Sequence, residues 1–85
     1  MLFLSLLKTT YGKVSDHPTL LKRIWSVPPP QGVKILGVFF LFGAYDGAII
    51  FEASDFRAAK DFIMKIAAQG VYRIETMGAI PAEEL

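Results

Sequence analysis

Apolar and polar residues alternate or run together in four short stretches of this chain, and each stretch predicts a β-strand. Turn-forming residues bound these stretches, among them Tyr11-Gly12 after the first and Pro81 after the last. The expected strands are residues 2–10, 33–42, 47–53 and 71–80. Two segments between them instead carry apolar residues at helical spacing, so the predicted element order is βαββαβ.

The first helix is expected to begin after a capping Ser15 or Asp16 and to end before the prolines at 28–30. Its apolar stripe consists of Leu20, Leu21, Ile24 and Trp25. The three prolines lack amide donors and fix an extended backbone. They therefore predict a stiff connection to the second strand.

The second helix is expected to begin after a capping Ser54 or Asp55 and to end at Gly70. Its apolar face consists of Phe56, Ala59, Phe62, Ile63 and Ile66. Asp61 and Lys65 lie four residues apart on the polar face, in the order that favours an ion pair.

A tyrosine and an aspartate, Tyr45 and Asp46, interrupt the apolar run between the second and third strands. Asp46-Gly47 is a strong hairpin signal, because both residue types tolerate the positive backbone angles of a tight turn. We therefore interpret Asp46 first as a turn residue.

This element order predicts one α+β domain over residues 1–85, with a ferredoxin-like fold. Its antiparallel sheet is expected in the strand order 4-1-3-2, with both helices on one face. The second strand is then an edge, yet residues 35–42 are apolar on both faces. A monomer would expose one of these faces, so the pattern predicts a homo-oligomer, at least a dimer.

Composition removes several classes of function. Nine basic and eight acidic residues, spread along the chain, give a net charge of +1 and argue against nucleic-acid binding. Cysteine is absent, which excludes thiol chemistry and cysteine zinc sites and fits a cytoplasmic location. His17 is the only histidine and no ligand spacing is visible, so we expect neither a metal nor a cofactor. The apolar runs are too short or too interrupted to span a membrane.

The motif Gly43-Ala44-Tyr45-Asp46 at this hairpin, residues 50–55 leading into a helix, and Leu6-Leu7-Lys8 followed by Thr10 resemble the GYD domain family. The resemblance runs over nearly the whole chain, roughly residues 3–79. It implies a small prokaryotic protein similar to the dimeric α/β barrels, in which two sheets pack face to face. It implies no reaction, because the family is functionally uncharacterised.

Three residues are candidates for catalysis. Tyr45 and Asp46 could form a proton-transfer pair, and His17 has the side chain that normally titrates near neutrality. Each also has a plainer interpretation. Asp46 can make the turn while Tyr45 packs at its base, and a histidine beside Pro18 at a helix start is commonly exposed. We favour the plainer interpretation for all three.

Binding and interface candidates come from the strands. Ser5 and Thr9 share one side of the first strand and, with Tyr45, could be polar points in a pocket for a small apolar ligand. The expected interface residues are Val38, Phe40, Phe42, Arg73 and Glu75.

Two functions remain open from the sequence. The one we favour is a non-catalytic, oligomeric module for ligand binding or interaction. The alternative is a cofactor-free enzyme, similar to an oxygenase or isomerase, with an apolar pocket between sheet and helices. A pocket that contains Tyr45, Asp46 or His17 and has an open mouth would support the enzyme. A sheet interface that is closed by phenylalanines and has no cavity would support the module.

Overall fold

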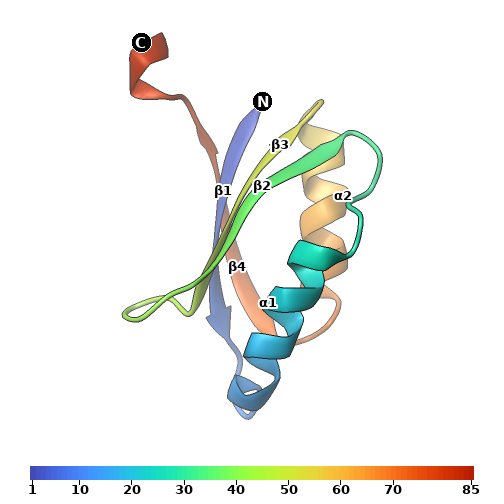
Figure 1. The fold of residues 1–85 in the computed structure, drawn as a ribbon, viewed down its shortest axis with the longest axis vertical. Coiled ribbons are helices and arrows are strands. Elements are labelled where there is room, and N and C mark those ends of the chain that lie inside the picture. The colour runs from blue at the N-terminus through green and yellow to red at the C-terminus, as the bar shows by residue number, and fades with distance from the viewer.

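The computed structural model covers residues 1–85 and has the predicted βαββαβ order. Its elements are β1 (Leu2–Thr9), α1 (His17–Ser26), β2 (Val33–Phe40), β3 (Gly47–Ala53), α2 (Phe56–Ala67) and β4 (Tyr72–Ala79). Two 3₁₀ turns, Val14–Asp16 and Ala82–Glu84, precede α1 and follow β4. One four-stranded sheet carries both helices on the same side (Figure 1).

The sheet order is β2-β3-β1-β4, which is the predicted order 4-1-3-2. All neighbouring strands are antiparallel. A bulge between Ile35 and Gly37 shifts the register of β2 against β3. Because of this extra residue, Val33, Ile35, Val38 and Phe40 all pair with β3 residues that lie on the helix-covered side of the sheet.

The core lies between the helices and the sheet. Each helix packs mainly on the strands, α1 on β2 and α2 on β3 and β4. Leu7, Ile49 and Phe51 are completely buried at the centre. Phe51 contacts the rings of Phe3 and Phe62, with centroids 5.3 and 4.9 Å away. Only 19 of 85 residues are buried, as expected for a domain too small to enclose a large core.

The connection between β2 and β3 differs from the predicted Asp-Gly turn. β2 ends at Phe40 rather than Phe42, and residues 41–46 form a longer loop that projects from the sheet (Figure 1). Gly43 is the loop residue with a positive φ, at 144°, whereas neither Asp46 nor Gly47 has one. The dipeptide is therefore not a tight turn: Gly47 is buried as the first residue of β3.

The prediction for α2 is confirmed only in part, since the helix spans Phe56–Ala67 and ends before Gly70. The Asp55 side chain accepts a 2.8 Å hydrogen bond from the Ala58 amide and caps the helix. The ion pair between Asp61 and Lys65 is absent, because Asp61 instead lies 3.3 Å from Lys60. Phe56, expected on the apolar face, is 70% exposed, and its ring lies edge-to-face with that of Phe3, with centroids 6.1 Å apart.

The start of α1 is also different. Its cap residue, Asp16, makes no side-chain hydrogen bond, because the 3₁₀ turn before it already directs the chain into the helix. Neither α1 nor α2 has the length and apolarity needed to cross a bilayer.

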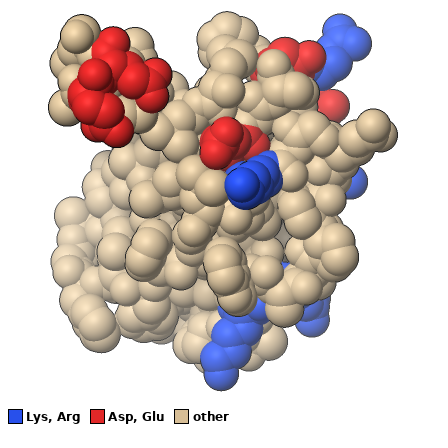
Figure 2. All heavy atoms as spheres, turned by 45° about the horizontal axis from the view of Figure 1, so that its top comes forward, with Lys and Arg blue, Asp and Glu red and all other residues tan.

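The C-terminal segment after β4 extends away from the body of the molecule (Figure 1). Its 3₁₀ turn contains Glu83 and Glu84, and Leu85 is 93% exposed. Figure 2 shows these acidic side chains gathered on the projecting end, while most of the neighbouring surface is uncharged. This segment therefore adds an exposed acidic group beside the sheet.

Candidate functional site

His17 is buried and held at both ring nitrogens. It is 3% exposed, which corrects the expectation of an exposed helix-start histidine. Its Nδ1 lies 2.5 Å from the Tyr72 hydroxyl and its Nε2 lies 2.7 Å from the Asp46 carbonyl oxygen. A carbonyl can only accept, so in the neutral ring Nε2 donates to Asp46 and Nδ1 accepts from Tyr72. Neither nitrogen is free to take a proton from a substrate.

Tyr72 is the partner of His17 that the sequence analysis missed. As the first residue of β4 it points under the helices, with its ring centroid 5.3 Å from that of His17. Burial, and secondarily the charge of Asp46, raises the pKa of Tyr72 to about 12. The two residues are 55 positions apart, so no local pattern could pair them.

Asp46 connects the end of the loop to the end of β1. Its Oδ2 accepts hydrogen bonds from the amide and hydroxyl of Thr9, at 2.8 and 3.0 Å, and Lys8 Nζ lies 3.9 Å away. The Asp46 amide also donates to the Leu7 carbonyl oxygen at 2.8 Å. The amide of Thr9 is the main reason why the pKa of Asp46 is lowered. These contacts fasten the loop to β1.

Tyr45 does not pair with Asp46. Its hydroxyl donates a 2.5 Å hydrogen bond to Glu75 of β4, whereas the Asp46 carboxylate binds Thr9. This hydrogen bond is the main cause of the raised pKa of Tyr45, because it stabilises the protonated phenol. The two neighbouring side chains thus fasten the same loop to two different strands, and the arrangement is not an acid–base pair.

Ser5 and Thr9 both lie on the helix-covered side of β1, and both hydroxyls form hydrogen bonds within the chain. Ser5 is completely buried and its hydroxyl lies 2.8 Å from the hydroxyl of Thr76 on β4. The Thr9 hydroxyl donates a hydrogen bond to the Asp46 carboxylate. No buried side-chain nitrogen or oxygen lacks a hydrogen-bond partner. The polar groups on this side are therefore satisfied within the chain.

The other side of the sheet is uncovered, and we call it the open face. Its residues, assigned from alternation and pairing, are Leu2, Leu4, Leu6, Lys8, Lys34, Leu36, Phe39, Ala48, Ile50, Glu52, Arg73, Glu75, Met77 and Ala79. Leu36, Phe39 and Met77 are 42–48% exposed. The charged residues lie toward the ends of the strands. Lys8 of β1 lies opposite Arg73 of β4 in the strand register, and Lys34 of β2 lies opposite Glu52 of β3.

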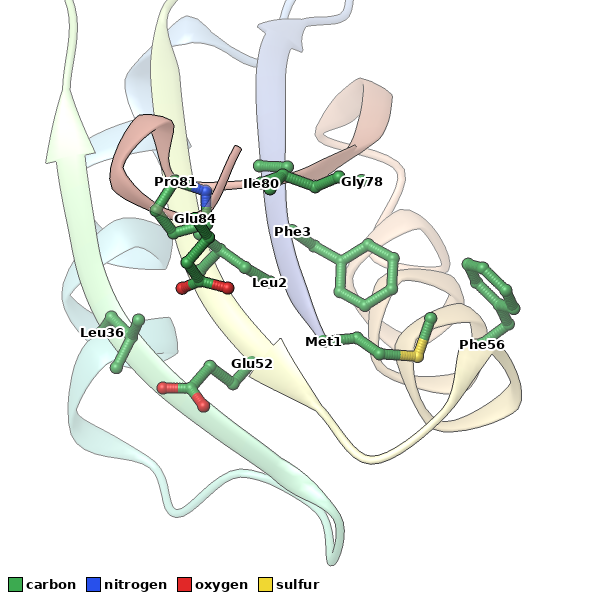
Figure 3. A pocket seen from close by; sticks show the side chains of 11 residues that line it. Met1, Leu2, Phe3, Leu36, Glu52, Phe56, Gly78, Ile80, Pro81 and Glu84 are labelled. Carbon is green, nitrogen blue, oxygen red and sulfur yellow. The ribbon is translucent and has the colours of Figure 1, made fainter.

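A hollow of about 810 Å³ lies at the N-terminal end of β1. Figure 3 shows Leu2, Leu36 and Glu52 from three strands on its sheet side, with Glu84 of the C-terminal segment above them. The hollow is mainly apolar and joins the open face to the exposed C-terminal segment. It extends the exposed apolar surface beyond the sheet.

The predicted interface residues lie on different sides. Val38 and Phe40 pair with Ile49 and Gly47 and face the helices, and the Phe40 ring lies 4.8 Å from that of His17. Phe42 lies beyond the strand and is 94% exposed. Arg73 and Glu75 belong to the open face. On β2 the open face presents Leu36 and Phe39 instead.

The fold and the open face together define a ferredoxin-like α+β protein with helices on one side of its sheet. Residues 6–85 match the GYD domain family, so the chain belongs to this family. No curated protein matches the chain in sequence.

Two solved structures have a similar fold. One is the crystal structure of FFRP-DM1, with a TM-score of 0.71 and 21% identity over 93% of this chain and 97% of that chain. The other is the hypothetical protein PHS023 from Pyrococcus horikoshii, with a TM-score of 0.69 and 19% identity over 94% of this chain and 90% of that chain. At these identities the likeness concerns the fold.

Proposed function

We propose that this protein is a non-catalytic module that works as a homo-oligomer, at least a dimer, assembled through the open face. The observation that carries this proposal is the exposed apolar surface of the open face, where Leu36 and Phe39 on the edge strand β2 and Met77 on the edge strand β4 are each more than 40% exposed. Contiguous exposed apolar surface of this kind marks interaction sites. An apolar centre with charges around it also has the layout of a protein–protein interface.

A second copy of the chain is the partner that the charges favour. Each end of the open face carries both signs of charge: Lys8 and Arg73 lie near Glu75 at one end, and Glu52 lies opposite Lys34 at the other, with Glu84 of the C-terminal segment above it. Two sheets packed face to face can place the charges at each end of one copy against opposite charges of the other copy. Such complementarity favours one orientation over others.

The enzyme alternative has less support from the geometry. Both nitrogens of His17 are occupied, and Tyr45 and Asp46 have separate structural partners. A general base must reach the proton that it abstracts. The three candidate residues instead fix the loop, α1 and β4 in place, which is a structural use of polar side chains.

Light scattering coupled to gel filtration tests the proposal. The protein should elute as a dimer or larger at micromolar concentration, because the open face would otherwise remain in water. Phe39→Lys and Leu36→Lys should each shift the population to monomer, since a buried unpaired charge is costly. Their melting curves as monomers should still show cooperative unfolding.

Met64→Lys is the matched control, because Met64 is an equally apolar residue that is 62% exposed on α2, away from the open face. It should leave the oligomer unchanged. A wild-type protein that stays monomeric at micromolar concentration would contradict the proposed self-association.

A further inference from the structure

A second hollow lies on the helix side of the sheet, and we call it the inter-helix cleft. It has a volume of about 280 Å³ and lies between α1, α2, β2 and the proline segment Pro28–Pro30. Its floor consists of Leu20, Ile24, Phe62 and Ile66, all buried. The cleft is on the opposite side of the sheet from the open face. Ligand binding in the cleft is therefore independent of self-association through the open face.

Two cationic side chains lie at this apolar cleft, one from each helix. Arg23 belongs to α1 and Lys65 to α2, and both are exposed residues that line the same hollow. Neither forms an ion pair, since the structure contains only Lys8–Asp46 and Lys60–Asp61. Asp16 and Asp61 line neighbouring hollows beside Arg23 and Lys65, respectively, but neither comes within ion-pair distance of these cations.

The walls of the inter-helix cleft provide few other hydrogen-bonding groups. The three prolines have no amide hydrogen, so this wall cannot donate a backbone hydrogen bond. Apart from Arg23 and Lys65, Gln69 is the only polar side chain that lines the cleft. An apolar floor with a few polar groups at the rim is the usual composition of a small-molecule site, and the volume is near the lower limit of about 300–1,000 Å³ for such sites.

We propose that the inter-helix cleft binds a small organic anion, a carboxylate with an apolar body such as a medium-chain fatty acid. The aliphatic part would cover Leu20, Ile24 and Ile66, and the carboxylate would accept hydrogen bonds from Arg23 and Lys65. Arginine suits this role because its planar guanidinium matches a carboxylate. The small volume and apolar floor argue against larger polyanions such as nucleotides.

Octanoate is the probe, followed by amide chemical shifts in a 15N-labelled sample of the whole chain. Saturable shifts should appear at Arg23, Ile24, Ile35, Lys65 and Ile66, with a dissociation constant of about 1 mM or tighter for a ligand of this size. Octylamine has the same chain and the opposite charge. It should bind much more weakly, because Arg23 and Lys65 would repel it.

The double variant Arg23→Gln/Lys65→Gln should weaken octanoate binding about three- to tenfold, which corresponds to two partly exposed charge contacts. The control is Lys22→Gln/Lys60→Gln, which changes the net charge equally at exposed positions of the same helices, outside the cleft. It should leave the affinity unchanged. All four positions are exposed, so both variants should fold.

Three results would overturn the proposal. The first is an absence of saturable shifts at the cleft. The second is equal binding of octylamine, which would show that the surface responds only to apolar chains. The third is an equal loss of affinity in the control variant, which would assign the effect to net charge. Gel filtration measures self-association through the open face independently of octanoate. A failure of octanoate to bind the cleft would therefore not affect the test of self-association.

Discussion

The two faces of the sheet come from the same four strands, yet they are used differently. On the helix-covered face Leu7, Ile49 and Phe51 are completely buried, and the polar Ser5 is hydrogen-bonded to Thr76. On the open face, Phe39 remains 48% exposed although it lies one strand away from that core. In this chain the helices cover one side of a sheet whose strands are apolar on both sides, and the other side stays open.

The largest expected effect comes from making the same change, phenylalanine to alanine, on each face of the sheet. Phe51→Ala removes a ring that stacks on Phe3 and meets Phe62 edge-to-face, and it should lower the free energy of unfolding by about 3–5 kcal/mol. Phe39→Ala should lower it by less than about 1 kcal/mol, because an exposed ring leaves little cavity. Urea denaturation measures both.

Both phenylalanine variants are best compared in the Leu36→Lys background, so that any association through the open face does not enter the measured stability. Equal losses for the two variants would show that the monomer already depends on both faces. The distinction between a covered and an open face would then fail.

The next effect concerns two glycines of the covered face. A Cβ at Gly47 would lie 3.2–3.3 Å from His17, Leu21 and the Phe39 carbonyl oxygen. Gly47→Val should therefore cost about 1–3 kcal/mol through overpacking. The reason is close packing, not the positive φ that the turn prediction would require.

Gly78→Val is the control for this site. A Cβ at Gly78 meets nothing within 4 Å, and its φ is not positive. Because valine favours strands, this variant should be neutral or slightly stabilising in a thermal melt. A loss at Gly78 as large as that at Gly47 would mean that the strand backbone, rather than side-chain crowding, is sensitive.

The sequence predicts the fold well because hydrophobic periodicity and turn residues are local signals. The element order follows from such signals, and the sheet order follows from the fold that this element order indicates. The sequence offered Ser54 or Asp55 as the cap of α2, and the structure selects Asp55. The roles of the candidate site residues are harder to predict from the sequence. Asp46 and Gly47 look like a tight turn until the contacts with Thr9 and His17 are known, and these come from segments far away in the sequence.

The bulge in β2 explains a second difference between the sequence prediction and the structure, namely which β2 side chains face the helices. One extra residue near Leu36 changes which side chains face the helices, and so Val38 and Phe40 lie on the covered side. Hydrophobicity cannot reveal this, because residues 38–40 are all apolar. An apolar strand carries no alternation from which its faces can be assigned.

The smallest expected effect is at Asp46, where the two faces meet at the end of β1. The carboxylate binds Thr9, whose side chain is on the covered side, and lies near Lys8 of the open face. Asp46→Asn keeps one oxygen that can accept from Thr9 and loses the charge. At neutral pH it should therefore cost about 1 kcal/mol, typical of one weakened hydrogen bond. Urea midpoints measure this loss, and Asp61→Asn, at an exposed residue of α2, should show none.

Acid should reduce the difference between wild type and Asp46→Asn. The pKa of Asp46 in the folded protein is lowered from 3.8, so the carboxylate stabilises the fold above this value. That contribution is lost as the pH falls through the lowered, folded-state pKa, because the protonated side chain no longer offers Thr9 a charged acceptor. The amide variant has no such proton to bind. Wild type and variant should therefore approach the same midpoint in acid, and a gap that persists there would assign the loss to the shape of the amide rather than to charge.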